Sequence, residues 1–139
     1  MKISKFLSKQ VRERAQQRCE YCQTAEWLNG QAHQVDHITP RALGGVTTLG
    51  NLCLACVPCN SFKQDNIEAI DPETQQRVLL FNPRTQRWTE HFAWNDDGIQ
   101  IIGLTSCGRA TVVALQFNRP LIQMARAVWV SANQHPPVD

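Results

Sequence analysis

The stretches Cys19-Glu20-Tyr21-Cys22 and Cys56-Val57-Pro58-Cys59 decide how this chain folds. Each carries two cysteines separated by two residues, and 33 residues, 23 to 55, lie between the stretches. One such pair alone can be two core cysteines or a redox couple, but two pairs offer the four thiolates of a tetrahedral zinc site. We therefore expect one structural zinc, with no open coordination position, bound by Cys19, Cys22, Cys56 and Cys59.

The polar residues between and beside these pairs are of the kinds that bind a hard divalent cation and activate water. Asp36 and His37 are adjacent, Asn51 lies 14 positions after His37, and Asn60 directly follows the last cysteine. Carboxylate and carboxamide oxygens suit Mg²⁺, and an imidazole can accept a proton from water near neutral pH. A zinc site that brackets such a set is typical of a small metal-dependent nuclease.

The length of 139 residues is that of one domain with room for an appendage. The apolar fraction of 42% and mean hydropathy of −0.34 are those of a globular protein. No apolar run approaches the ~20 residues of a membrane span, and the basic segment 1–7 lacks the apolar stretch of a secretory signal. We therefore expect a cytoplasmic protein with no membrane partner, whose paired cysteines bind zinc rather than form disulfides. The sequence does not indicate an oligomeric state.

The net charge of +2 conceals a strongly basic segment at residues 1–18. That segment holds, against the single acid Glu13, the cations Lys2, Lys5, Lys9, Arg12, Arg14 and Arg18. A run of this kind is either the solvated face of a helix or an arm that contacts phosphate groups. Next to a candidate nuclease site, Lys5, Lys9 and Arg12 become candidates for contacts with DNA.

Hydrophobic spacing and turn residues predict the elements of the first half. These are a helix over 4–18, strands over 31–38 and 49–55, and a helix from the second cysteine pair to about residue 70. Ser4 or Ser8 can cap the first helix, and Pro58 suits the first turn of the second. The strands are expected to pair as a hairpin with a long loop, in which Gly44-Gly45 marks a flexible turn.

The second half is predicted to be a hairpin followed by two helices. We expect strands over 77–81, 88–94 and 99–104, and helices over 106–117 and 119–133. Residues 95–98 form a strong turn signal between two of the strands, Asn118 is the expected cap of the last helix, and Pro120 falls in its first turn. Residues 1–72 and 73–139 are expected to pack together as one globular unit.

The region from Cys19 to Lys63 resembles the HNH nucleases, also called the ββα-metal or His-Me finger family. The pattern that carries the resemblance is Cys19-x-x-Cys22, Asp36-His37-Ile38-x-Pro40, Gly44-Gly45, Asn51-Leu52, Cys56-x-x-Cys59-Asn60 and Lys63. Its spacing also resembles the HNH domain of RNA-guided CRISPR effector nucleases, and the second half is similar to a tail on many small bacterial HNH proteins. The resemblance implies a ββα-metal core clipped by zinc. With the C-terminal β-hairpin and two-helix extension, the expected fold class is α+β.

The resemblance also implies a metal-dependent DNA endonuclease that leaves 5′-phosphate and 3′-hydroxyl ends. His37 is then the candidate general base, and Asn51 can accept a hydrogen bond from its second ring nitrogen. Asp36 and Asn60 would bind the catalytic Mg²⁺ or Mn²⁺, and asparagine at this last position, where many relatives have histidine, indicates a hard-metal preference. As strand neighbours, Asp36 and His37 point to opposite faces, so a local bend must bring both to the site.

Two further cations are candidates for contacts with the DNA backbone. Arg41 lies just past the first strand and Lys63 lies one helical turn beyond Asn60, so either can hold a phosphate. A second function, from another class, is a catalytically silent zinc-clipped module that binds DNA or protein. The presence of every motif position favours the enzyme, because a silent relative can freely lose His37 or Asn51.

The remaining residues of chemical interest have structural explanations. His33 is expected on a strand surface, where it can still touch DNA. His91 is expected to pack among the aromatic side chains of 88–94, which are more often a core than a platform for stacking bases. Cys53 and Cys107 are expected to be small core residues rather than ligands.

Overall fold

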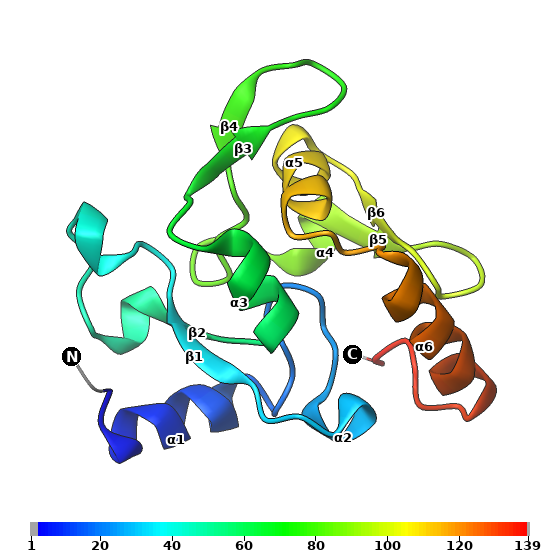
Figure 1. Ribbon diagram of the computed structural model, residues 1–139, viewed down its shortest axis with the longest axis horizontal. Coiled ribbons are helices and arrows are strands. Elements are labelled where there is room, and N and C mark those ends of the chain that lie inside the picture. The colour runs from blue at the N-terminus through cyan, green and yellow to red at the C-terminus, as the bar shows by residue number, and fades with distance from the viewer. Residues whose placement is uncertain (1–2, 139) are drawn as a thin grey trace. The chain divides into compact units, whose positions relative to one another are not determined.

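The computed structural model describes residues 3–138 (Figure 1). The chain forms two compact units: Met1–Ile67 with Asn82–Thr85, and Glu68–Phe81 with Gln86–Asp139. Each unit contains helices and short strands, which confirms the α+β class. Lys2, one of the cations of the basic segment, lies outside the described residues. Among those residues, no helix has the length and apolar character that crossing a bilayer requires.

Helix α1, Lys5–Arg14, begins where the sequence predicts. The hydroxyl of Ser4 accepts a hydrogen bond of 3.1 Å from a backbone N–H of the first turn, which satisfies one of the unpaired donors there. Val11 is fully buried in the core of the first unit. The helix ends earlier than predicted because Gln16 and Gln17 adopt left-handed backbone conformations, with φ of 56° and 59°.

A β-hairpin forms the centre of the first unit. Strands β1 (Gln34–His37) and β2 (Leu52–Ala55) pair antiparallel over all four of their residues. Every residue of β2 is buried. The long loop between the strands contains two 3₁₀ turns, Arg41–Leu43 and Leu49–Asn51. The predicted hairpin with its long loop is therefore confirmed, with shorter strands than the sequence indicates.

Helix α3, Val57–Lys63, follows β2 directly and has Pro58 in its first turn as predicted. The predicted continuation of this helix to residue 70 is wrong. Gln64 takes a φ of 52°, a left-handed angle that ends the helix, and Glu68–Ile70 forms strand β3 instead. The short helix α2, Glu26–Asn29, was not predicted.

The second unit contains the predicted C-terminal hairpin and two helices. Its elements are β3 with β4 (Arg77–Leu79), the helical turn α4 (Trp88–His91), β5 (Phe92–Trp94) with β6 (Ile101–Gly103), α5 (Ser106–Ala114) and α6 (Pro120–Ser131). The strand predicted over 88–94 is correct only in its second half. The first four residues form a turn of helix, which brings the Trp88 ring within 5.1 Å of Phe92 and 5.8 Å of Trp94, measured between ring centroids.

Buried polar groups hold the second unit together. Asn118, predicted to cap α6, instead pairs its carboxamide with the backbone N–H and C=O of Ile101, at 2.8 and 2.9 Å. The fully buried Arg126 donates hydrogen bonds to two backbone carbonyls. Arg109 forms a two-pronged ion pair with Asp71 at 3.0 and 2.9 Å, and this hydrogen bonding lowers the pKa of Asp71 well below its usual range.

Aromatic side chains form the core of the second unit, as predicted. The Phe92 side chain is almost fully buried and contacts the rings of Phe81 and Phe117, with centroids 5.2 and 5.5 Å away. His91 lies edge-on to Phe81, and its Nδ1 is 2.7 Å from the hydroxyl of Thr105. His91 is thus a structural residue of this core.

Candidate functional site

The four cysteines of the two pairs meet in one buried cluster. Their Sγ atoms all lie within 4.8 Å of one another, and those of Cys22 and Cys56 are 3.6 Å apart. Zinc–sulfur bonds of about 2.3 Å in a tetrahedron place the sulfur atoms roughly 3.8 Å apart, so this donor set fits zinc. Cys56 also caps α3, because its Sγ accepts the backbone N–H of Cys59 at 3.4 Å. The fold therefore brings together all four predicted zinc ligands.

The protonation of the cluster favours a bound dication. Hydrogen bonds within the cluster, first from Cys19, lower the pKa of Cys22 well below its usual value. Burial raises the pKa of Cys19, and the hydrogen bond with Cys19 raises that of Cys59. A thiolate is thus favoured at Cys22 beside the thiols of Cys19 and Cys59, because buried thiolates repel one another. A dication removes this repulsion and holds all four sulfurs as thiolates.

The other two cysteines lie outside the cluster, as predicted. The Sγ of Cys53 lies 3.6 Å from the Tyr21 hydroxyl, and burial raises the pKa of this thiol to about 12. Cys107 is half-buried in the second unit, and burial raises its pKa as well. Both are therefore protonated and chemically quiet at neutral pH.

Strand β1 presents alternate side chains to helix α3. The Nδ2 of Asn60 donates a hydrogen bond of 2.6 Å to Gln34, and the Nζ of Lys63 lies 3.3 Å from the Oδ2 of Asp36. Gln34 and Asp36 share one face of the strand, and Asn60 and Lys63 share one face of the helix. Helix α3 therefore lies along the strand. The two residues predicted to bind a catalytic cation, Asp36 and Asn60, come from elements in direct contact.

Lys63, predicted to hold a phosphate, is instead buried, with only 2% of its side chain exposed. Its ammonium group contacts Asp36 and also lies 3.4 Å from the backbone carbonyl of His37. The ion pair is not aligned as a hydrogen bond, so the buried Oδ2 of Asp36 has no hydrogen-bond donor among the described residues. Burial raises the pKa of Asp36, and the charge of Lys63 opposes that shift. Asp36 thus carries a carboxylate with one ammonium counter-ion, and carboxylate oxygens are ligands that hard cations prefer.

His37 ends strand β1 and is half-buried. Its Nε2 lies 2.9 Å from the hydroxyl of Thr47, in the loop that follows the strand. The pairing of β1 with β2 continues regularly through His37, so no bulge interrupts the strand between Asp36 and His37. Because His37 is the last residue of β1, its ring lies next to the following loop, and Thr47 of that loop positions it.

Asn51 was predicted to contact the imidazole ring of His37. It contacts the loop backbone instead. Its Oδ1 accepts the N–H of Thr39, and its Nδ2 donates to the carbonyls of Thr39 and Val46, each at 2.9 Å. These bonds connect the two sides of the loop. Thr47 occupies the position beside the ring that was predicted for Asn51. The sequence does not reveal this role, because nothing in the spacing distinguishes Thr47 from Thr48.

The site thus consists of a two-stranded hairpin followed by a helix, and four cysteines hold these elements together. Asp36, His37 and Asn60 follow one another in this order along the chain. Residues 19–66 match the HNH endonuclease family. The match covers about a third of the chain, and we call residues 19–66 the HNH domain. No curated protein and no solved structure matches the chain. The HNH domain includes both cysteine pairs and the elements β1, β2 and α3, and it ends two residues before β3 begins.

Helix α1 precedes the HNH domain and carries cations with two different roles. Lys5 and Lys9 are exposed, and the only described ion pair of Lys9 is a distant one of 3.9 Å with the exposed Glu13. Arg14 instead donates to the backbone carbonyls of Leu49, in the 3₁₀ turn before β2, and Leu52, the first residue of β2, at 2.9 and 2.6 Å, and so fastens α1 to the hairpin. Arg41 is exposed on the loop of the HNH domain. Lys5, Lys9 and Arg41 therefore keep their predicted accessibility to DNA.

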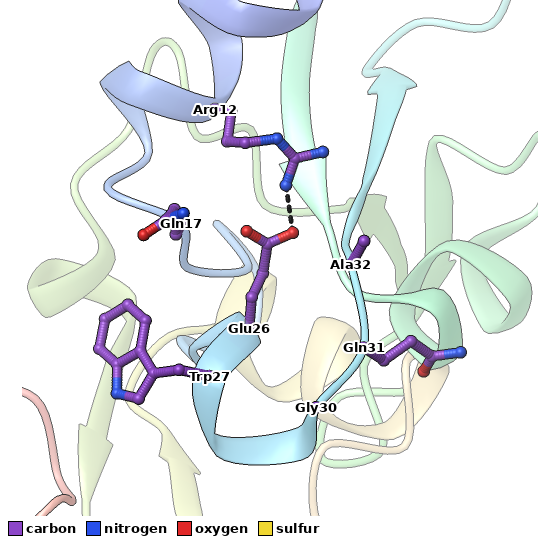
Figure 2. Close-up of a pocket in the computed structure, with 7 residues that line it drawn as sticks. All are labelled: Arg12, Gln17, Glu26, Trp27, Gly30, Gln31 and Ala32. Carbon is purple, nitrogen blue, oxygen red and sulfur yellow. Dashed lines mark hydrogen bonds and ion pairs between the residues drawn. The ribbon is translucent and has the colours of Figure 1, made fainter.

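Arg12, predicted to contact DNA, makes contacts within the fold. Its guanidinium pairs with Glu26 and donates to the backbone carbonyl of His33 at 3.1 Å. The ion pair lines a surface pocket of about 350 Å³, together with Gln17, Trp27, Gly30, Gln31 and Ala32 (Figure 2). The prediction that His33 lies on a strand surface is wrong: it is buried, and its Nε2 lies 2.8 Å from the carbonyl of Thr24. Arg12 and His33 thus contact Glu26 and Thr24, which lie in or next to α2, a helix that the sequence does not predict.

Proposed function

We propose that this chain is a metal-dependent endonuclease that hydrolyses DNA phosphodiester bonds and leaves 5′-phosphate and 3′-hydroxyl ends. The HNH domain supports nuclease activity through its family, and DNA and the end chemistry are the parts that we add. One observation carries the proposal. The half-buried Asp36 carboxylate, with an ammonium group as its counter-ion, directly precedes an imidazole that faces an exposed loop. Hydrolysis of a phosphodiester needs such a cation-binding oxygen beside a proton acceptor.

His37 acts as the general base in this proposal. When the N–H at Nε2 donates to the Thr47 hydroxyl, Nδ1 keeps its lone pair. Nδ1 then takes a proton from the water that attacks phosphorus. Thr47 is a positioning residue, because its hydroxyl fixes the ring orientation and the tautomer without touching the substrate.

Asp36 and Asn60 would hold the catalytic Mg²⁺ or Mn²⁺, which their oxygens suit. Such an ion stabilises the charge that develops on the phosphate and on the leaving 3′-oxygen. The side chain of Asn60 donates its Nδ2 to Gln34, which leaves its oxygen for the ion. Lys63 balances the charge of Asp36 from the buried side, and it holds the carboxylate against α3.

A plasmid-cleavage assay tests the proposed function. Zinc-loaded protein is incubated with supercoiled plasmid, either with Mg²⁺ or Mn²⁺ or without added divalent ion. We expect nicked or linear product only with the ion, and nicks that DNA ligase reseals directly, since ligase requires 5′-phosphate and 3′-hydroxyl ends. Intact plasmid with both ions, from protein that holds zinc and binds DNA, would contradict the proposal and favour a catalytically silent DNA-binding module.

Replacing Lys5 and Lys9 by alanine is expected to weaken DNA binding to a similar extent for all sequences. Both side chains are exposed on α1 and are the described cations of this helix that the fold does not use. Each lost phosphate contact removes about 0.9 from the slope of log K against log salt concentration, so the double substitution should flatten the slope by about 1.8. Fluorescence anisotropy with labelled duplexes at several salt concentrations measures this change.

The matched control for this experiment replaces Arg77 and Arg87, two exposed cations of the second unit, by alanine. It removes the same charge from the chain, and we expect it to keep the slope. An equal flattening in the control would show that net charge governs binding rather than α1. An unchanged slope after loss of Lys5 and Lys9 would mean that these lysines are only a solvated helix face.

A further inference from the structure

The loop between β1 and β2 exposes two aliphatic side chains beside the proposed catalytic base. Leu43 is 57% exposed and Val46 is 59% exposed. Val46 directly precedes Thr47, whose hydroxyl contacts the His37 ring. Single exposed apolar side chains are ordinary on protein surfaces, so exposure alone decides nothing. The rigidity and the charge of this loop are the observations that indicate a function for Leu43 and Val46.

Hydrogen bonds hold the backbone of the loop that carries both side chains. The carboxamide of Asn51 makes three hydrogen bonds of 2.9 Å to the backbone of Thr39 and Val46. The N–H of Gly45 donates to the Pro40 carbonyl at 3.0 Å, and a Cβ at Gly45 would lie 1.8 Å from the carbonyl oxygen of Thr39. Only glycine fits this close approach of two backbone segments. These bonds fix the loop backbone that carries both side chains, so little backbone ordering is needed when a partner binds.

The charge around the pair suits a nucleic acid. No aspartate or glutamate occurs from residue 37 to residue 64. The charged residue of the loop is Arg41, which is exposed two positions before Leu43. The loop can therefore approach phosphate groups without electrostatic repulsion. A rigid aliphatic pair flanked by an arginine matches the side chains that proteins insert into the minor groove of DNA.

We propose that Leu43 and Val46 form a wedge that enters the minor groove and partly unstacks one base step next to the scissile phosphate. This inference rests on the proposed function and adds its substrate class, duplex DNA that is bent at the cut. Aliphatic wedges unstack base steps and kink the duplex toward the major groove. Because Val46 adjoins Thr47, the kink lies close to the His37 ring and moves the backbone at that step toward the base.

The first test measures DNA unwinding and needs no knowledge of a target sequence. Relaxed circular plasmid is bound by the His37→Ala protein in the presence of a type I topoisomerase, and the linking number is read after the protein is removed. Unstacking a base step unwinds the duplex, so we expect a shift in linking number. The Leu43→Ser, Val46→Ser double variant in the same background should bind within about threefold and give no shift. The matched control is Leu79→Ser, which removes a 62% exposed aliphatic side chain from β4 and should keep the shift.

The second test compares cleavage of intact and pre-distorted duplexes by proteins that retain His37. We expect the double variant to cleave an intact duplex about tenfold more slowly in kcat/KM than the unsubstituted protein. A duplex with a one-nucleotide bulge at the mapped cut is already unstacked, so both proteins should cleave it at rates within about twofold of each other. A loop with a merely structural role would lower both rates together.

The outcomes separate the wedge from the function on which it rests. A linking-number shift that survives the double substitution, or an equal loss of cleavage on both duplexes, would overturn the wedge and leave the endonuclease intact. Failure of the unsubstituted protein to cut any DNA would overturn both. A shift that depends on Leu43 and Val46, together with recovery of cleavage on the bulged duplex, would establish the wedge.

Discussion

Removal of zinc, or the substitution Cys59→Ser, is expected to unfold the HNH domain. The four cysteines of the cluster are almost fully buried, and two of them flank the start of α3. Structural zinc sites contribute on the order of 10–16 kcal/mol at neutral pH, while whole domains are stable by only about 5–15 kcal/mol. Losing the ion therefore removes as much free energy as keeps the domain folded. Elemental analysis should find one zinc per chain. When the zinc is removed, the backbone amides of β1 and β2 should lose their protection from hydrogen exchange.

Cys107→Ser is the matched control, because it removes a thiol that is half-buried and lies outside the cluster. That variant should keep one zinc and full protection of β1 and β2. Protected strands in zinc-free protein, or in Cys59→Ser, would show that the apolar core alone maintains the domain and that the cluster has another role.

The parts of the fold that the sequence predicts correctly depend on local patterns. Two cysteines spaced by two residues at a helix start place their sulfurs on one side, so the ligand set follows from spacing alone. Pro58 marks the start of α3, and the glycine pair at 44–45 marks a turn between the strands. Such features need no knowledge of distant contacts.

The ends of elements were harder to predict, because they depend on backbone angles that no residue type requires. Gln64 ends α3 with a φ of 52°, although glutamine is an ordinary helix residue. Gln16 and Gln17 end α1 in the same way. Helix α2 has only four residues, which is too short for the periodicity of apolar residues to reveal it.

The partners of the polar side chains could not be predicted either, since they come from distant positions. Lys63 pairs with Asp36 across two elements, and its burial results from the packing of α3 along β1. Asn51 has the spacing of the family motif, but its hydrogen bonds go to the loop backbone. Arg12 is a candidate for DNA contact by its sequence position, but nothing in the sequence predicts its ion pair with Glu26. The sequence thus indicates candidate residues for the site but not which atoms face each other.

The substitution His37→Ala is expected to lower the rate of DNA cleavage by about 10²–10⁴-fold, the range by which a positioned general base accelerates a reaction. The imidazole is half-buried at the end of β1 and makes its described hydrogen bond with a loop hydroxyl, so its removal leaves the hairpin paired. Zinc content and DNA affinity should therefore stay near those of the unsubstituted protein, because base catalysis acts in the transition state and not in binding. Single-turnover cleavage of a labelled duplex under saturating protein measures the loss.

The neighbouring residues should respond differently and so distinguish a base from a metal ligand. Asp36→Ala and Asn60→Ala remove oxygens that would hold the ion, so raising the Mn²⁺ concentration should restore part of their rate, whereas His37→Ala should not recover. Thr47→Val deletes the hydroxyl beside the Nε2 of His37, and its cleavage rate should lie between those of the unsubstituted protein and His37→Ala. Thr48→Ala serves as the control, because the exposed Thr48 side chain makes no cap hydrogen bond. Full activity in His37→Ala would mean that another group activates the water. Recovery of His37→Ala with Mn²⁺ would assign His37 to the ion instead, and either result would refute the mechanism.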